Sequence, residues 1–460
     1  MRRSVLCALV VVAPARGHAD GNAIVGGSPR AIGRAGAAVV GDDGGGALLI
    51  NPAVMARRDT TRAELGGAAV EDTVEWQRDA LGVPLSVARA GSRVAPFGAG
   101  IAALGDWVVG VGATTAAVVA RSLPHPRDVP GDALDKLGQA YDYRYAGIAG
   151  SYRRDMVAIG AARRLGDSLA LGVSLGGSRV AVIEQRRIWS SSTDRDATPD
   201  PDAHTDQSDI DLKLSGTDPL VASGVLGVLY APGDTPIEIG ASLGWSRAVQ
   251  LDGSVTAAGI AMGPAATTTA PHASLRLDQP LAVRGGGRYV GDRVVAELDG
   301  DLWIAPSGSD AAAWQLRGVH VADGAADPAD PGADLTRVPS RISQRTHLAV
   351  RAAVDFAVVP GFLWITGGYA FATGATPAAQ LSPSFGDLGG HTLGLGLEAT
   401  AGSITVTLGW SRTWSPGTDA GSHLQVDGPF AGGSGPVPSG TYYGSNDQAG
   451  VLIEAEFGGH

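Results

Sequence analysis

Hydrophobic and polar residues alternate along most of the chain after residue 60. In the stretch RVVAELDGDLWI, which begins at Arg293, Val294, Leu298 and Leu302 share one face of a strand, while Glu297 and Asp299 share the other. A period of two residues is typical of β-strands, whose successive side chains point to opposite faces. Because no long segment with the 3.6-residue period of a helix follows residue 60, the pattern predicts an all-β fold.

The links between the predicted strands alternate between short and long. The short links are Gly105-Asp106, Leu165–Asp167, Ala231–Pro236, Gly291-Asp292, Pro360-Gly361 and Ala401–Ser403. Long polar links begin near Ser122, Ser191, Asp323 and Asp427. A water-soluble β-sandwich would also alternate, but the short–long order is typical of a transmembrane barrel with tight periplasmic turns and extended outer loops. We therefore predict a transmembrane antiparallel β-barrel of about 14 strands over residues 61–457, followed by a tail at 458–460.

The first residues resemble a secretory signal peptide. Arg2 and Arg3 precede a short apolar run, which ends at the small-x-small sequence Gly17-His18-Ala19. We expect residues 1–19 to be removed by cleavage after Ala19, and the barrel to reside in the outer membrane of a Gram-negative cell. Since Cys7 is the only cysteine, the mature chain would hold neither a disulfide nor a cysteine-based metal site.

Composition excludes several classes of function. A net charge of -11 argues against nucleic-acid binding, which needs a basic surface. The nine histidines form no zinc-protease motif, so we expect no metal and no cofactor. The acidic residues between Asp194 and Asp211 lack the glycine and closing glutamate of an EF-hand and are interpreted as a solvated outer loop rather than a Ca²⁺ site.

Two stretches match the hydrolase pattern G-x-S-x-G, one centred on Ser174 and the other on Ser242. The hydrolase motif exposes its serine at a sharp strand-to-helix turn. Both stretches lie instead inside alternating strands with no helix after them, and chance matches are expected in a chain with 68 glycines. We therefore predict no catalytic residue and no enzymatic activity.

Residues 20–60 differ from the rest of the chain. The segment DGNAIVGGSPRAIGRAGAAVVGDDGGGALLINPAVMARRD is too apolar and too rich in Gly and Ala to be a solvated linker, and too short to be a domain. Before a barrel, its natural place is inside the lumen, as a hatch that plugs it.

The part of this segment from Ser28 to Ala56, SPRAIGRAGAAVVGDDGGGALLINPAVMA, resembles the N-terminal hatch of the FadL/TodX family. Members of that family carry long-chain fatty acids and aromatic hydrocarbons through the outer membrane. The resemblance implies a fourteen-stranded barrel closed by the hatch, and passive transport of hydrophobic molecules, most simply long-chain fatty acids. The substrate would be captured between outer loops, held in a pocket beside the hatch and released sideways through the wall near Trp107–Ala120.

The resemblance also names candidate residues. The positions that match the family's Asn-Pro-Ala and its preceding acidic pair are Asn51, Pro52, Ala53, Asp42 and Asp43, which are candidate gating residues of the hatch. The ligand-binding candidates are Leu48, Leu49, Ile50 and Trp107, and Trp245 and Trp303 are further contributors. The expected partners of this monomer are hydrophobic small molecules, either fatty acids or aromatic hydrocarbons, and the lipids of the outer membrane.

Two other functions remain open at the level of sequence. A structural or adhesion barrel could keep the fold without transport. An open porin for polar solutes would suit the charged inward faces at Glu297, Asp299 and Arg351.

Overall fold

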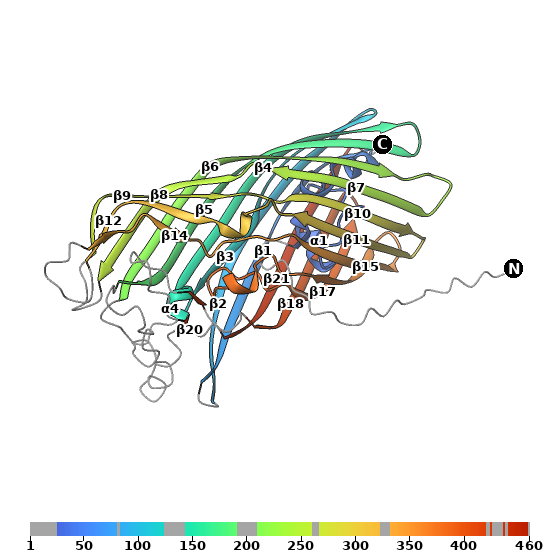
Figure 1. The fold of residues 1–460 in the computed structure, drawn as a ribbon. Coiled ribbons are helices and arrows are strands. Elements are labelled where there is room, and N and C mark those ends of the chain that lie inside the picture. The colour runs from blue at the N-terminus through green and yellow to red at the C-terminus, as the bar shows by residue number, and fades with distance from the viewer. Residues whose placement is uncertain are drawn as a thin grey trace.

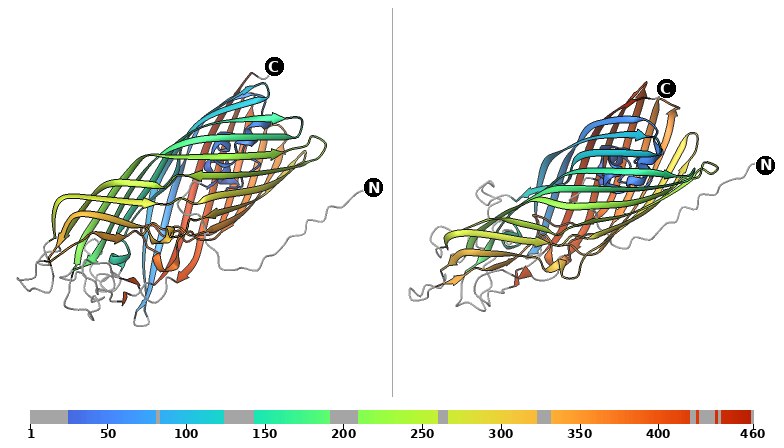
Figure 2. Two further views of the ribbon diagram at one scale, coloured as in Figure 1. Left: turned by 45° about the horizontal axis from the view of Figure 1, so that its top comes forward. Right: turned by 90° about the horizontal axis from the view of Figure 1, so that it is seen from above.

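Fourteen long strands form a closed antiparallel barrel in the computed structural model, which describes residues 25–80, 83–123, 143–190, 209–259, 266–322, 332–419, 424–425, 436–437 and 440–458 (Figures 1 and 2). In order around the wall they are β1 Thr61–Ala80, β2 Val83–Leu104, β3 Trp107–Ser122, β4 Ala149–Leu165, β5 Leu169–Trp189, β6 Asp209–Tyr230, β7 Ile237–Ser246, β10 Leu281–Val290, β11 Val294–Ile304, β15 His347–Val359, β16 Leu363–Ala372, β17 Gly390–Ala401, β18 Ile404–Asp419 and β21 Thr441–Phe457. The barrel closes where β1 pairs with β21, with Thr61 opposite Phe457. The predicted fold class is confirmed.

Short turns join neighbouring strands at one end of the barrel, which we call the turn end. Gly105, Gly166, Gly361 and Gly402 have positive φ there, between 62° and 74°, a conformation that glycine adopts without strain. These turns are among the short links predicted from sequence. The opposite end, called the loop end, is where the long links leave the wall, and most of their residues lie outside the described ranges.

The alternation of side chains separates a lipid-compatible surface from a polar lumen. On β11, Leu298 and Leu302 are exposed on the outside, whereas Glu297 and Asp299 are buried inside. On β15 the exposed Val350 precedes the buried Arg351. This apolar-out, polar-in arrangement is typical of membrane barrels. Among the described helices, none is both long enough and apolar enough to cross a bilayer.

Three of the wall strands continue toward the loop end after a break. β7 is followed by β8 Val249–Gly259, β9 Ala266–Leu277 precedes β10, and β11 is followed by β12 Ala313–Val321. Beyond the breaks, β8 pairs with β6, β9 with β8, and β12 with β9. Their inward side chains form a hydrophobic core at the loop end with residues of β5 and β6, for example Trp314, Leu251 and Val182.

The acidic stretch that was interpreted as a solvated loop is in part a buried structure. Its residues from 191 to 208 lie outside the described ranges, but Asp209 begins β6 and is fully buried. Arg144 Nε donates to Asp209 Oδ2 at 2.9 Å and Arg187 Nη1 donates to the same oxygen at 3.1 Å. Two buried guanidinium groups thus neutralise this carboxylate, so the interpretation was wrong at this residue.

Short elements complete the fold. In the N-terminal part they are η1 Val25–Gly27, α1 Pro29–Gly33, α2 Ala47–Ile50 and η2 Pro52–Arg57; elsewhere they are α4 Tyr143–Ala146, η5 Ser309–Ala311, β13 Ala333–Asp334, β14 Arg337–Pro339, η6 Ala378–Gln380, β19 Leu424–Gln425 and β20 Pro436–Val437. The N-terminal elements lie inside the barrel toward the turn end (Figures 1 and 2). There α1 contacts β17, β18 and β21, and η2 contacts β4, β5 and β6 on another side of the lumen.

Candidate functional site: the lumen and its N-terminal segment

The segment from Val25 to Arg58, called the N-terminal segment below, is tied to the wall through Asn51. The Asn51 side chain accepts a hydrogen bond from Ala53 N at 3.3 Å and so caps the short helix that Pro52 begins. Its Nδ2 donates to Val39 O at 2.9 Å, within the segment, and to Val228 O at 3.2 Å, on β6. Asn51 is completely buried, and Pro52 and Ala53 are also buried. One amide thus joins the two halves of the segment to the barrel.

The serines of the two G-x-S-x-G stretches donate hydrogen bonds to the N-terminal segment. Ser174 Oγ on β5 donates to Leu48 O at 2.6 Å, and Ser242 Oγ on β7 donates to Ile50 O at 2.5 Å. These bonds satisfy carbonyls at the end of the single-turn helix α2, which have no partner within so short a helix. These serines are hydrogen-bond donors to the segment, a role that the sequence analysis missed.

Glycines on three adjacent strands allow this close approach. A Cβ on Gly172 of β5 would overlap the backbone of Ala53, and one on Gly227 of β6 would overlap Asn51 Oδ1. A Cβ on Gly240 of β7 would lie 3.0 Å from Asn51 Nδ2. Glycine within a strand often marks a place where another backbone approaches closely. We call this strip of β5, β6 and β7 the glycine cradle.

Asp43 lies among four arginine side chains, three from the segment and one, Arg62, from β1. Arg58 Nε donates to its Oδ2 at 2.7 Å and Arg58 Nη2 donates to its Oδ1 at 3.1 Å. Arg57, Arg62 and Arg30 lie at 3.7, 3.6 and 3.5 Å from its carboxylate oxygens. Burial alone would raise the pKa of Asp43, but these four guanidinium groups outweigh it and hold the pKa well below its usual range.

Its neighbour Asp42 lies in a different environment. Asp42 accepts a hydrogen bond from Ser28 Oγ and another from Gly44 N at 3.2 Å. Burial raises the pKa of the Asp42 carboxyl, and the nearby Arg30 offsets this rise only in part. The two adjacent aspartates therefore differ in function within the segment: Asp43 is a fixed anion, whereas Asp42 shapes the turn before α2.

Acidic residues of the wall hold the middle of the segment. Asp299 Oδ2 accepts hydrogen bonds from Ala38 N at 2.8 Å and Val39 N at 3.0 Å. Glu297 Oε1 accepts from Val40 N at 2.8 Å and Gly41 N at 2.9 Å. These two carboxylates, which the sequence analysis linked to a water-filled porin, bind the backbone of the N-terminal segment instead.

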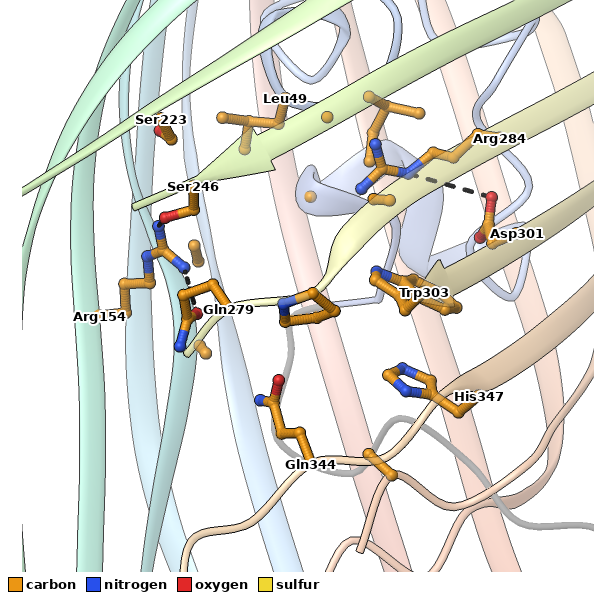
Figure 3. A pocket seen from close by; sticks show the side chains of 18 of the residues that line it. Leu49, Arg154, Ser223, Ser246, Gln279, Arg284, Asp301, Trp303, Gln344 and His347 are labelled. Atoms are coloured by element: carbon orange, nitrogen blue, oxygen red, sulfur yellow. Dashed lines mark hydrogen bonds and ion pairs between the residues drawn. The ribbon is translucent and has the colours of Figure 1, made fainter. Parts of the chain in front are cut away.

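A cavity of about 330 Å³ lies beside the segment, on its loop-end side (Figure 3). Leu49 and Ile50, two of the ligand-binding candidates, line it together with Trp245 and Trp303. Leu48 does not line it: its side chain is buried against β3 and β4, where a Cβ on Gly160 would lie 2.7 Å from Leu48 Cδ2.

Trp107 is also absent from this cavity. It begins β3 at the turn end, is 47% exposed on the outer face, and lies beneath Arg163, whose Cζ is 5.2 Å from the indole centroid. The structure thus brings Leu49 and Ile50 to the cavity, and not Leu48 or Trp107.

Arg154 is the most distinctive polar group of the cavity, and the sequence analysis did not name it. Its Nε donates to Ser178 Oγ at 2.9 Å. Its Nη2 donates to Ser246 Oγ at 3.0 Å and its Nη1 to Gln279 Oε1 at 3.3 Å (Figure 3). All three acceptors are neutral, and among the described residues no carboxylate lies within ion-pair distance of this guanidinium. By contrast, the cavity's Arg351 pairs with Asp301. A cation without a matching anion, at the edge of an apolar cavity, is suited to receive an anionic headgroup.

A second buried loop covers the cavity from the loop end. Residues 381–390, between β16 and β17, are all buried, and Phe385 joins the loop-end hydrophobic core. Arg121 Nη1 donates to Gly386 O at 3.0 Å, and Ser382 Oγ donates to Ala146 O at 3.0 Å. Phe385 also lines the cavity. The cavity is therefore bounded along the barrel axis by this loop on one side and by the N-terminal segment on the other.

The ladder between β2 and β3 is incomplete beside the cavity. Pairing runs from Leu104 opposite Trp107 to Phe97 opposite Thr114 and stops there, where Pro96 has no N–H to donate. On its other side β3 has a bulge against β4 at Ala116, and this residue lines the cavity. Bulges bend a strand and interrupt its pairing. The two strands approach again at Gly91, where a Cβ would overlap Ala120 O.

Comparisons with known proteins show which solved structures share this fold. The chain matches no family model and no curated protein sequence. It does share its fold with the solved structure of a Pseudomonas aeruginosa FadL homologue, with 13% identity, a TM-score of 0.70, and coverage of 96% of this chain and 100% of that one. The Pseudomonas putida toluene transporter TodX has 14% identity, a TM-score of 0.68, and coverage of 95% and 100%. The Ralstonia pickettii toluene transporter TbuX has 13% identity, a TM-score of 0.63, and coverage of 94% and 98%. The resemblance found in the sequence is confirmed at the level of the fold.

Proposed function

We propose that this protein is an outer-membrane transporter for hydrophobic molecules, and that long-chain fatty acids are its main substrates. The observation that carries the proposal is the cavity: apolar residues such as Leu49, Trp245 and Trp303 line most of it, and the guanidinium of Arg154 lies at its edge, hydrogen-bonded to the neutral side chains of Ser178, Ser246 and Gln279. An acyl chain gains about 25 cal/mol for each Å² of its surface removed from water, and its carboxylate would bind Arg154.

The N-terminal segment is the hatch in this proposal, and Asn51, Pro52, Ala53, Asp42 and Asp43 hold it closed. The glycine cradle and the carboxylates of Glu297 and Asp299 attach it to the wall, so the lumen is not a water-filled pore. This arrangement favours transport of apolar molecules over a porin function.

The substrate leaves sideways, through the incomplete ladder between β2 and β3. Ala116 and Ala117 line the cavity at the bulge in β3, so the cavity reaches the wall at the place where hydrogen bonding between the strands has stopped. An apolar molecule passing here would enter the lipid without crossing water.

Uptake of labelled oleate by cells that lack their own fatty-acid transporter tests this function. We expect cells expressing the protein to exceed an empty-vector control at matched amounts of folded barrel. Pro52→Ala should reduce uptake and leave that amount unchanged. Labelled toluene, supplied in a parallel assay, would show whether neutral aromatic molecules are preferred. A large, steady ion conductance in planar bilayers would instead favour the porin, and a folded barrel that takes up neither compound would favour the structural role.

A further inference from the structure

The cavity reaches the wall at a second place, far around the barrel from β2 and β3. Trp245, Ser246, Gln279 and Pro280 all line it. Trp245 and Ser246 end β7, just before the break that separates it from β8, and Gln279 and Pro280 lie in the break between β9 and β10. Pairing between β7 and β10 stops at Gly244 opposite Ala282, and pairing between β8 and β9 resumes only at Val249 opposite Leu277. Residues 245–248 and 278–281 therefore face each other without a ladder.

Proline explains part of this break. Pro280 has no N–H to donate to a ladder, and Pro219 is in the facing part of β6, where the pairing with β5 is irregular. Asp218 and Ala222 of β6 provide acceptors for polar groups of the break and of the start of β8. Gln250 N donates to Asp218 Oδ2 at 2.7 Å, Arg247 Nη2 donates to Asp218 Oδ1 at 2.8 Å, and Arg247 N donates to Ala222 O at 2.9 Å. Irregular backbone at membrane depth is tolerated where it lines a cavity or is satisfied in this way.

The wall is thin at the link between β9 and β10. Gln279 and Pro280 line the cavity, while the preceding residue, Asp278, lines a separate hollow of about 450 Å³. The exposed residues Arg276 and Arg337 also line that hollow, so it lies on the outer surface. A single short link therefore separates the cavity from the outside.

Trp245 lies where the cavity meets the outer surface of the barrel. Its indole is 47% exposed, and along β7 it follows the outward-facing Ile239 and Leu243. Beyond the break the outward residues of β8 are polar, beginning with Gln250 and Asp252. The break thus lies at the edge of the apolar outer surface, where an amphipathic molecule rests with its chain in lipid and its charged group in water.

We infer that the break between β7/β8 and β9/β10 is a second portal in the barrel wall, through which the cavity exchanges amphipathic, long-chain carboxylates with the outer surface of the membrane. Arg154, on β4, donates hydrogen bonds to Ser246 on one side of the break and to Gln279 on the other (Figure 3). These bonds hold the two sides of the break together. A carboxylate that binds Arg154 would replace these two neutral acceptors and release the link. Because the buried loop of residues 381–390 and the N-terminal segment bound the cavity along the barrel axis, the wall is the way in as well as the way out. This inference rests on the proposed transport function.

Bulky labels on the outer surface test the portal without filling the cavity. The mature chain is expected to contain no cysteine, so the cysteine introduced in each variant is the single site of labelling. Trp245→Cys places a label beside the break, and Leu243→Cys places one two residues away on the same outer face, within an intact ladder. Leu281→Cys and Val283→Cys form the corresponding pair on β10, both 38% exposed in the native protein, and serve if the first pair does not fold. Each variant is reacted with a bulky maleimide, and labelled oleate uptake is compared with the same variant unlabelled.

We expect labelling at position 245 or 281 to abolish most of the uptake, and labelling at position 243 or 283 to leave it unchanged, with equal folded barrel by heat-modifiable gel mobility. Equal uptake before and after labelling at 245 and 281 would overturn the portal while the transport function stands. An equal loss at all four positions would also overturn it, since the effect would not depend on the break. If the unmodified protein takes up no oleate, the proposed function fails and the portal fails with it.

Discussion

Replacement of Asn51 by alanine should loosen the N-terminal segment without unfolding the barrel. The substitution removes three hydrogen bonds, to Ala53 N, Val39 O and Val228 O. At about 1 kcal/mol net for each bond, docking of the segment would weaken by about 3 kcal/mol. Since about 1.4 kcal/mol corresponds to a tenfold change in an equilibrium constant, the undocked population should rise about 100-fold.

Hydrogen exchange measures this effect at the amides that depend on docking. Val39 N and Val40 N donate to Asp299 and Glu297 on the wall, so their protection reports directly on the docked state. We expect their protection to fall about 100-fold in Asn51→Ala, while amides of β16 and β17 keep theirs. Asn446→Ala, which removes another buried asparagine away from the segment, is the matched control. Unchanged protection in Asn51→Ala would refute the view that this side chain joins the segment to the wall.

Three further predictions concern the cradle, the cavity and pH. Gly227→Ala places a Cβ where Asn51 Oδ1 lies, so it should displace the segment and raise ion conductance in planar bilayers; Gly100→Ala, whose Cβ would meet nothing within 4 Å, should not. Arg154→Ala should weaken oleate binding about 10–100-fold, as expected for a lost charged hydrogen bond, and leave toluene binding unchanged, whereas the outward-facing Arg153→Ala should change neither. Because the pKa of Asp43 in the folded protein lies well below the ordinary value of about 3.9, its stabilisation is present above that value and is lost only as pH falls through the lower folded-state pKa. Asp43→Asn should therefore weaken docking of the segment, measured by hydrogen exchange against the native protein at the same pH, by the same factor at pH 7 and at pH 5.

The barrel could be predicted from sequence because its strands obey a simple local rule. Each wall strand separates lipid from lumen, so residues such as Leu298 and Glu297 must alternate, and tight turns such as Gly105-Asp106 must join strands at one end. Composition also led to the expectation that residues 20–60 pack against a surface, because a segment so rich in small apolar residues needs one; the described part of it, from Val25 to Arg58, lies against the inside of the wall.

The cavity could not be predicted in the same way, because it depends on where the regular pattern fails. Pro280 and the bulge at Ala116 interrupt ladders, and a pairing pattern gives no sign of which interruption adjoins an empty space. The serines of G-x-S-x-G were recognised as a motif, but their contacts with Leu48 and Ile50 join residues more than 120 positions apart. A usable signal was present: glycine and serine alternate on lumen-facing positions of both β5 and β7, which is the pattern of a surface that receives another backbone.

Passage of a hydrophobic molecule from the cavity into the membrane, through the wall beside Ala116, is the central step of the proposed function. Ala116→Trp would fill the incomplete ladder between β2 and β3, and Ala113→Trp, on the outer face where the ladder is intact, is its control. The measurement is uptake of labelled oleate by cells with equal amounts of folded barrel, alongside oleate binding to the purified protein. We expect Ala116→Trp to lose uptake and keep binding, and Ala113→Trp to keep both. Full uptake by Ala116→Trp would contradict release through this part of the wall.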